Sequence, residues 1–175
     1  MNLETNRLLF RHYTDQDFPF LLSLLTNPDV VRFIGRGKPR NEQEGIDFLQ
    51  WIYDTYRVAE YIGLMVVIDK ERNIPIGHAG LVPQTINGRK EIEVGYWIAR
   101  KYWGNGYATE AATALVEFVR ERFRYNKLIA LIQPGNTASI QVAKNAGMYF
   151  GEKVNLNGQE VHIYQILQSE KRGTK

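Results

Sequence analysis

The chain of 175 residues is 44% apolar and 23% charged, a balance that fits one globular domain over residues 1–175. Its 22 basic and 19 acidic residues give a net charge of +3, which is too small to predict a nucleic-acid partner but compatible with an anionic ligand. The sequence has no cysteine and its three histidines lie far apart, which excludes disulfides, thiolate nucleophiles and cysteine-type zinc sites and predicts no metal site.

The amino-terminal segment "MNLETNRLLF" carries Glu4 and lacks the apolar run of a signal peptide. The longest continuous apolar run, from Leu64 to Ile68, is far shorter than the roughly 20 residues of a membrane-spanning helix. We therefore expect a cytoplasmic protein with no membrane partner.

The first part of the chain predicts one strand and two helices. Arg7–Tyr13 is strand-like, and Thr14 and Asp17 have the spacing of a capping box ahead of apolar residues at helical intervals. Gly35–Arg40 must be a loop because two glycines and a proline interrupt it, and its three basic residues face either solvent or an acidic substrate. Glu42–Arg57 predicts the second helix.

The middle of the chain predicts three strands that pair in sequence order. Tyr61–Asp69 and Ile74–Val82 are rich in residues that favour strands. Ile86–Arg89 contains the Asn-Gly signal of a tight hairpin, and Ile92–Ile98 is the next strand. Consecutive strands with such short connections form antiparallel hairpins.

The last third of the chain alternates helices with strands. We expect helices over Tyr107–Phe123 and Thr137–Ala146, a buried strand over Lys127–Ile132, and two final strands joined at Asn157-Gly158. The unit from Ile92 to Ile132 is long enough for a parallel crossover. The predicted fold class is therefore α/β (α+β), with a mixed, mostly antiparallel sheet of about seven strands and four helices.

Two glycines, Gly104 and Gly106, stand directly before the helix that begins at Tyr107. A helix N-terminus exposes about four unpaired N–H groups, so glycines there let phosphate oxygens reach the backbone, and Arg100 and Lys101 add positive charge. The alternative is a strand-to-helix turn in which the glycines only relieve strain. The chain lacks a Walker Gly-Lys-Ser/Thr motif, and the dinucleotide fingerprint fits poorly because threonine occupies its third glycine position.

A third pattern fits better, and it consists of two blocks: "GYWIARKYWGNGYATEA" (Gly95–Ala111) and "NTASIQVAKNAGM" (Asn136–Met148). Together they resemble the Gcn5-related N-acetyltransferases (GNAT), and most closely the RimJ/RimL-like branch. The predicted order of strands and helices matches that family over nearly the whole chain. The resemblance implies a GNAT-like fold and an acetyl-CoA-dependent N-acetyltransferase that acts on a primary amine.

The resemblance also implies how acetyl-CoA binds. Lys101, Gly104 and Gly106 match the family's pyrophosphate loop, with Lys101 replacing the usual Arg or Gln, which keeps the charge but loses a planar fork. Backbone N–H groups of residues 103–108 would face the pyrophosphate, and the strand end at residues 98–100 would pair with the pantetheine arm. Trp103 either packs or contacts the ligand. The implied cofactor-binding residues are Ile98, Ala99, Arg100, Lys101, Trp103, Gly104, Asn105, Gly106, Tyr107, Ala108 and Asn136.

By the same resemblance, the amine attacks the thioester directly, without an acyl-enzyme. Glu93 is the predicted general base, and Glu91 is the reserve because the period of two places it on the same sheet face; either one could instead pair with a surface cation. Ala143 replaces the tyrosine that many relatives carry as general acid. Ser139 therefore either hydrogen-bonds the departing thiolate or bonds its own helix backbone, and Asn136 contacts pantetheine, caps that helix, or does both.

No motif identifies the acceptor amine, which in this family is set by the early helices and loop, about residues 14–57, and by the last hairpin. Three functions stay open: acetylation of a protein N-terminal α-amine, as ribosomal-protein acetyltransferases do; acetylation of a small amine such as a polyamine or an antibiotic; and non-catalytic acyl-CoA sensing. A homodimer is expected by analogy with the family.

Overall fold

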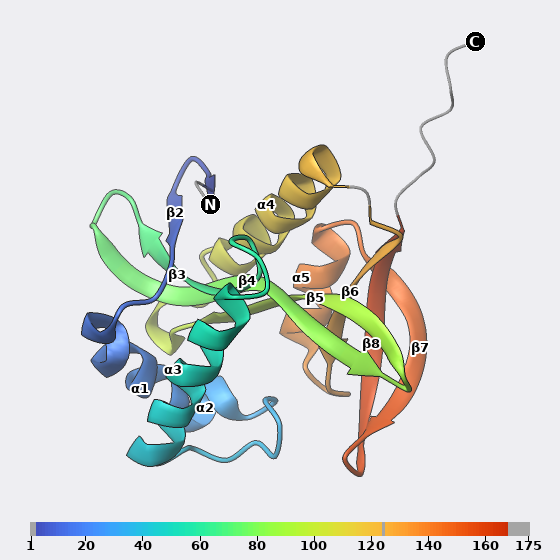
Figure 1. Ribbon diagram of the computed structural model, residues 1–175, viewed down its shortest axis with the longest axis horizontal. Coiled ribbons are helices and arrows are strands. Elements are labelled where there is room, and N and C mark those ends of the chain that lie inside the picture. Colours follow the sequence, from blue (N-terminus) through green and yellow to red (C-terminus); the bar gives the residue numbers. More distant parts are fainter. Residues whose placement is uncertain (1–2, 124, 168–175) are drawn as a thin grey trace.

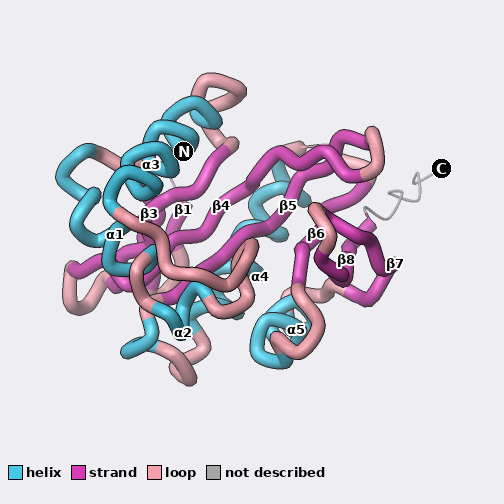
Figure 2. The backbone as a smooth tube through the Cα atoms, turned by 90° about the horizontal axis from the view of Figure 1, so that it is seen from below, coloured by secondary structure: helices cyan, strands magenta, loops and turns pink. Residues whose placement is uncertain are grey.

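The computed structural model describes residues 3–123 and 125–167, which form one mixed sheet with helices on both faces (Figures 1 and 2). Eight strands of this part follow the spatial order β1-β2-β3-β4-β5-β6-β8-β7, and each neighbouring pair is antiparallel except β5 and β6. The strands are β1 (Leu3–Glu4), β2 (Leu8–Arg11), β3 (Gly63–Asp69), β4 (Ile74–Ile86), β5 (Arg89–Ile98), β6 (Lys127–Ile132), β7 (Tyr149–Leu156) and β8 (Gln159–Leu167).

The helices divide between the two faces of the sheet (Figure 1). On one face lie α1 (Phe18–Leu25), α2 (Pro28–Val31) and α3 (Glu42–Tyr56), and on the other lie α4 (Tyr107–Arg122) and α5 (Thr137–Asn145). Two short 3₁₀ helices, Asp15–Asp17 and Arg100–Tyr102, precede α1 and α4. Among the described residues, no helix combines the length and the apolar character needed to cross a membrane.

Strand β3 is covered on both of its faces. Met65 and Val67 pack into the core beneath α4 and α5, whereas Leu64, Val66 and Ile68 pack into the core beneath α1 and α3. Alternate side chains of a strand point to opposite faces, so a strand covered on both sides reads as a continuous apolar run. This explains why the longest apolar run of the sequence is a strand.

The predicted fold class and element order are confirmed, with differences at the short elements. β1 and α2 were not expected, because two and four residues are too few to show a period. The capping box is present, since the Asp17 carboxylate accepts from the Thr14 N–H at 2.9 Å, but it opens a 3₁₀ turn, and α1 begins only at Phe18. The Asn-Gly hairpin is confirmed, with Asn87 and Gly88 at φ 50° and 77°.

The parallel contact between β5 and β6 is very short. Only two residue pairs, Ile92 with Leu128 and Glu93 with Ile129, lie in register. Beyond them β5 stays paired with β4, and β6 stays paired with β8. The two strands therefore diverge toward their carboxyl ends, where Figure 2 shows them on separate halves of the sheet.

Gly80 and Gly95 lie opposite each other on β4 and β5 and allow a matched test of packing. A Cβ on Gly80 would lie 2.0 Å from the Gly63 carbonyl oxygen, whereas a Cβ on Gly95 would meet no atom closer than 3.5 Å, its nearest neighbours being side-chain atoms of Leu64 and Val82. We expect Gly80→Ala to lower the free energy of unfolding by about 1–3 kcal/mol or more. Gly95→Ala should change it by less than about 1 kcal/mol. Urea unfolding measures both values, and equal losses would contradict this packing.

Candidate functional site

A cavity of about 590 Å³ opens where β5 and β6 separate, a volume typical of small-molecule and cofactor sites. One wall is β5 from Glu93 to Ile98, and the opposite wall is β6 from Ala130 to Ile132. The lining also includes the loop and first turn that lead into α4 (102–104 and 106–109), the segment that begins α5 (Gly135–Ser139) and residues of α2. Segments far apart in the sequence thus meet at the split in the sheet.

Most predicted site residues line this cavity. They are Glu93, Ile98, Trp103, Gly104, Gly106, Tyr107, Ala108, Asn136 and Ser139. The predicted cofactor-binding residues that do not border it are Ala99, Arg100, Lys101 and Asn105.

The edge of β5 that faces the cavity differs from the one that the sequence suggested. The Ala99 N–H donates to the Ile76 carbonyl on β4 at 2.8 Å, so its donor is already used. Backbone groups of a strand point alternately to either side, and therefore those of residues 94, 96 and 98 point away from β4 and toward the cavity. The available strand edge is centred on Tyr96 rather than on Ala99.

The two glycines make the turn into α4 and also leave it open. Gly104 and Gly106 have left-handed φ values of 77° and 78°, which favour glycine. A Cβ on Gly104 would meet no atom within 4 Å, so the space before it is free. The two interpretations of these glycines are therefore compatible, because the turn that needs them exposes the N-terminus of α4 to the cavity.

The N-terminus of α4 has no side-chain cap. Its first intrahelical hydrogen bond runs from the Glu110 N–H to the Gly106 carbonyl at 3.0 Å. The N–H groups of Tyr107, Ala108 and Thr109 consequently have no partner within the helix, and all three residues border the cavity. Such a terminus carries roughly half a positive charge and favours an anion.

The loop between β5 and α4 is held together by its own side chains. The Trp103 indole Nε1 donates to the Ile98 carbonyl at 2.6 Å, and Asn105 Nδ2 donates to the carbonyls of Tyr102 and Trp103, both at 3.0 Å. Trp103 is 43% exposed, so it is not a core residue. Its indole fixes the loop to the end of the strand.

Arg100 and Lys101 lie at the rim of the cavity. The Arg100 Nε atom is 3.4 Å from Asp29 of α2, and the Lys101 ammonium lies 4.8 Å from the Tyr102 ring centroid. Both side chains are exposed. They add positive potential near the open helix terminus without lining the cavity themselves.

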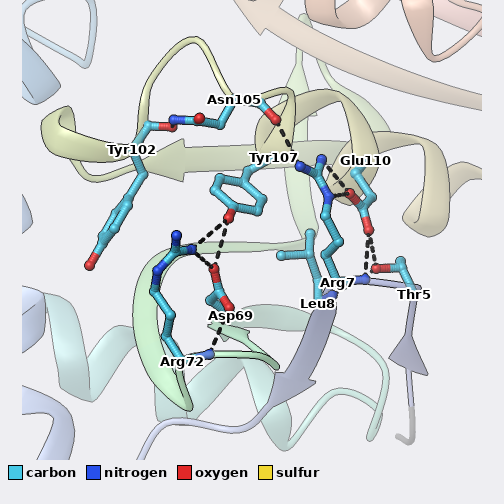
Figure 3. Close-up of polar contacts among 9 residues, drawn as sticks. All are labelled: Thr5, Arg7, Leu8, Asp69, Arg72, Tyr102, Asn105, Tyr107 and Glu110. Atoms are coloured by element: carbon cyan, nitrogen blue, oxygen red, sulfur yellow. Dashed lines mark hydrogen bonds and ion pairs between the residues drawn. The ribbon is translucent and has the colours of Figure 1, made fainter.

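A network of hydrogen bonds and ion pairs, which sequence reasoning missed, holds the start of α4 in place (Figure 3). The Tyr107 hydroxyl donates to Asp69 at 2.7 Å and accepts from Arg72 at 3.2 Å. Asp69 is 2% exposed, and hydrogen bonds from the Arg72 backbone and from Tyr107 lower its pKa to about 2. Arg7 and Glu110 form a second contact beside it. Apart from the contact between Asp69 and Arg72, no local pattern predicts these contacts, because the partners lie 35 residues or more apart in the chain.

Glu93 lies at the point where β5 and β6 part. Gln84 on β4 donates to its Oε2 atom at 2.6 Å. Burial raises the pKa of Glu93, and hydrogen bonds from Gln84 and the Leu131 backbone only partly offset that rise. A carboxylate whose pKa is raised toward neutrality accepts a proton more readily, as a general base must.

Glu91 has a different environment. Its Oε1 atom lies 2.6 Å from the Lys127 ammonium, and the two side chains are 10% and 19% exposed. It does not line the cavity. Glu91 and Glu93 thus share one face of the sheet, as the period of two predicts. Glu91, however, forms an ion pair, which is the alternative that the sequence left open.

Asn136, Ser139 and Tyr96 form a hydrogen-bonded group on the α5 side. The Asn136 Oδ1 atom accepts from the Ser139 N–H at 3.2 Å, which caps α5. The Tyr96 hydroxyl donates to the Ser139 carbonyl at 3.0 Å and lies 3.4 Å from the Ser139 Oγ atom. Burial raises the pKa of Tyr96 to about 12. Tyr96 stood in the first sequence block, but only the structure shows that it spans the opening.

No group of three or more His, Cys, Asp or Glu residues able to hold a metal ion occurs within residues 3–123 and 125–167. The polar groups around the cavity include backbone N–H groups, carboxylates, hydroxyls, side-chain amides and the Arg32 side chain.

The environments of Glu93 and Glu91 predict different effects of the same substitution on stability. Because burial raises the pKa of Glu93, its ionised form destabilises the fold as the pH rises through the folded-state pKa, whereas below the unfolded-state pKa of about 4.3 the penalty is absent. Glu93→Gln should therefore be at least as stable as the unmodified protein at pH 7, and any gain should vanish at pH 4.

The matched variant Glu91→Gln breaks the ion pair with Lys127 and should lower the free energy of unfolding at pH 7 by about 1–3 kcal/mol. Thermal unfolding of the three proteins at pH 4 and pH 7 measures both effects. A larger loss for Glu93→Gln than for Glu91→Gln at pH 7 would contradict the two assignments.

Comparisons with known proteins agree with this geometry. Residues 7–149 match the family model described as the acetyltransferase (GNAT) domain. The uncharacterized protein YkkB of Bacillus subtilis is 35% identical over 165 residues, covering 93% of this chain and 94% of that protein. A GNAT-family acetyltransferase from Bacillus anthracis superposes with a TM-score of 0.79 at 25% identity, covering 96% of this chain and 99% of that one. RimL, solved with coenzyme A, shares the fold with a TM-score of 0.78 at 17% identity, covering 95% and 98% of the two chains. This chain belongs to the GNAT acetyltransferase family.

Proposed function

We propose that this protein transfers the acetyl group of acetyl-CoA to a primary amine by direct attack on the thioester. The observation that supports this best is the divergence of β5 from β6, because it gathers an open helix terminus, a free strand edge and a carboxylate with a raised pKa around one cavity. The open helix terminus can bind a diphosphate, the free strand edge can pair with an extended arm that contains amides, and the carboxylate can accept a proton from an amine.

The cofactor is placed by backbone groups. The N–H groups at the start of α4, from Gly106 to Thr109, receive the diphosphate, and each charge-assisted hydrogen bond contributes about 1.5–3 kcal/mol. The edge of β5 at Tyr96, together with the Ile98 N–H, pairs with the amides of the pantetheine arm, while the Ile98 carbonyl already accepts from Trp103. The acetyl group then lies beside Glu93, near the point where β5 and β6 separate, which we call the fork.

Glu93 takes the proton from the attacking amine, directly or through water. The amine nitrogen bonds to the acetyl carbon, the carbon–sulfur bond breaks, and the coenzyme leaves as its thiolate. Deprotonating a lysine-like amine at pH 7 costs about 4.6 kcal/mol, against about 1.4 kcal/mol for an α-amine. The base therefore matters more for lysine-like and polyamine acceptors than for protein N-termini.

Many relatives carry a tyrosine on this helix that donates to the leaving thiolate. In this chain the hydroxyls of Ser139 and Tyr96 take that role. Ala143, at the position of that tyrosine, is fully buried. Ser139 lies one helical turn earlier on the same face of α5, and Tyr96 brings its hydroxyl to Ser139 from the opposite wall. With a pKa of about 12, Tyr96 stays protonated at neutral pH, and its single hydrogen would turn from the Ser139 carbonyl to the thiolate.

The acceptor is either a protein α-amine or a small amine. RimL, whose name denotes an α-N-protein acetyltransferase of ribosomal L7/L12, supports the first through a shared fold. A relative from Aspergillus fumigatus, the FsC-acetyl coenzyme A-N(2)-transacetylase, is 26% identical over 150 residues and supports the second. An acyl-CoA sensor without turnover is the third candidate. A cytoplasmic location and a homodimer stay predictions.

A panel of peptides, polyamines and other amines with acetyl-CoA tests the catalytic role, with CoA release and mass spectrometry as readouts. We expect Glu93→Gln to lower kcat/KM about 100-fold or more for a lysine-like acceptor. The loss should shrink as the pH rises, because more of the amine is then neutral without help. A uniform, small loss would remove Glu93 as the base, and CoA binding without turnover for any amine would favour the sensor.

Gly104 and Gly88 provide a matched test of the proposed diphosphate-binding site at the start of α4, which we call the seat. Both have φ 77°, and in both places a Cβ would meet nothing within 4 Å, so alanine brings the same backbone strain. Only Gly104 borders the cavity. Gly104→Ala should weaken CoA binding about 10- to 100-fold, and Gly88→Ala should leave it unchanged. Calorimetry measures both affinities, and similar values would speak against the seat.

A further inference from the structure

Arg7 is joined to the start of α4 although about a hundred residues of chain separate them (Figure 3). Its Nη1 atom donates to the Asn105 carbonyl at 3.0 Å, and its Nε and Nη2 atoms lie 2.6 Å from Glu110 Oε2. Its Cζ atom lies 4.5 Å from the centroid of the Tyr107 ring. One guanidinium therefore contacts a carbonyl, a carboxylate and an aromatic face within the same turn.

The contact with Asn105 sets the direction of a peptide group. In a trans peptide the carbonyl and the following N–H point in opposite directions. Because Arg7 holds the Asn105 carbonyl, the N–H of Gly106 points away from Arg7, and Gly106 borders the cavity. A carbonyl turned toward the cavity would instead repel an anion. Arg7 thus keeps the Gly106 N–H directed away from itself and the Asn105 carbonyl turned away from the cavity.

The contact with Glu110 concerns charge. Glu110 stands in the first turn of α4, where an unpaired carboxylate would oppose a bound diphosphate. Burial raises the pKa of Glu110, but hydrogen bonds from Thr5 and Arg7 outweigh that effect and lower it. Glu110 is therefore ionised at neutral pH, and the Arg7 guanidinium compensates its charge.

We propose that Arg7 is a positioning residue for the cofactor, which fixes the Asn105–Gly106 peptide and cancels the charge of Glu110 so that α4 presents a positive terminus to the diphosphate. This inference rests on the proposed function, since it requires acetyl-CoA to bind at α4. Arg7 acts through the loop and the helix, without touching the coenzyme itself.

Arg7→Gln tests the proposal through two ligands, of which only one contains the diphosphate. CoA carries it, together with a 3′-phosphoadenosine group, and pantetheine carries neither. Calorimetry with CoA should show affinity reduced about 10- to 100-fold, whereas an NMR titration with pantetheine should show an unchanged affinity. The control Arg89→Gln removes another exposed arginine, whose ion pair with Glu152 lies outside the cavity, and should bind both ligands normally. Equal losses for the two ligands would overturn the proposal.

Substitution of Glu110 separates charge compensation from loss of structure. Glu110→Gln alone should bind CoA at least as tightly as the unmodified protein, because the seat loses a negative charge and keeps Arg7. The double variant Arg7→Gln/Glu110→Gln should bind CoA several-fold more tightly than Arg7→Gln. If Glu110→Gln weakens CoA binding tenfold, or the double variant binds no better than Arg7→Gln, the proposal fails.

The two claims fail in different ways. If the unmodified protein does not bind CoA, the proposed function is wrong. If it binds CoA and Arg7→Gln binds CoA equally well, only the positioning role of Arg7 is wrong.

Discussion

The two-residue parallel contact between β5 and β6 is the constraint on which the site depends. If these strands paired along their whole length, the backbone groups of residues 94, 96 and 98 would bond to β6, and no cavity would form between them. Because they part after Glu93 and Ile129, an edge inside the sheet keeps backbone groups that need a partner. An extended ligand with amides of its own is the kind of molecule that satisfies such an edge.

The fold tolerates this opening because each strand keeps a complete partner on its other side. β5 pairs with β4 along its whole length, and β6 pairs with β8 from Lys127 to Ile132. A small apolar cluster of Ile86, Ile129, Val154, Val161 and Ile163 joins β4, β6, β7 and β8. The open end of the separation is spanned by the hydroxyl of Tyr96, which reaches the first turn of α5. The separation is therefore closed by strand pairing at one end and crossed by a polar contact at the other.

The order of strands and helices, the hairpin at Asn87-Gly88 and the parallel crossover were predictable because each rests on a local pattern or a chain length. Glu93 and most residues of the predicted cofactor loop border one cavity, and their roles stay predictions. The direction of the strand edge was not predictable, since it depends on which neighbour takes the Ala99 N–H.

The roles of Glu91 and Glu93 could not be separated by a period of two, which places both on one face; Lys127 and the fork distinguish them. Tyr96 and Arg7 were missed for a related reason. Their partners lie 43 and about 100 residues away, and no spacing along the chain encodes such contacts. The unpredicted part of the site therefore consists of tertiary contacts between elements that were individually foreseen.

Hydrogen–deuterium exchange with and without CoA tests most directly whether the fork and the start of α4 hold the coenzyme. We predict slower exchange at the amides of Gly104–Thr109 and at Tyr96 and Ile98, with no change in α3. At saturating CoA, protection confined to other segments, or no protection at all, would contradict this prediction.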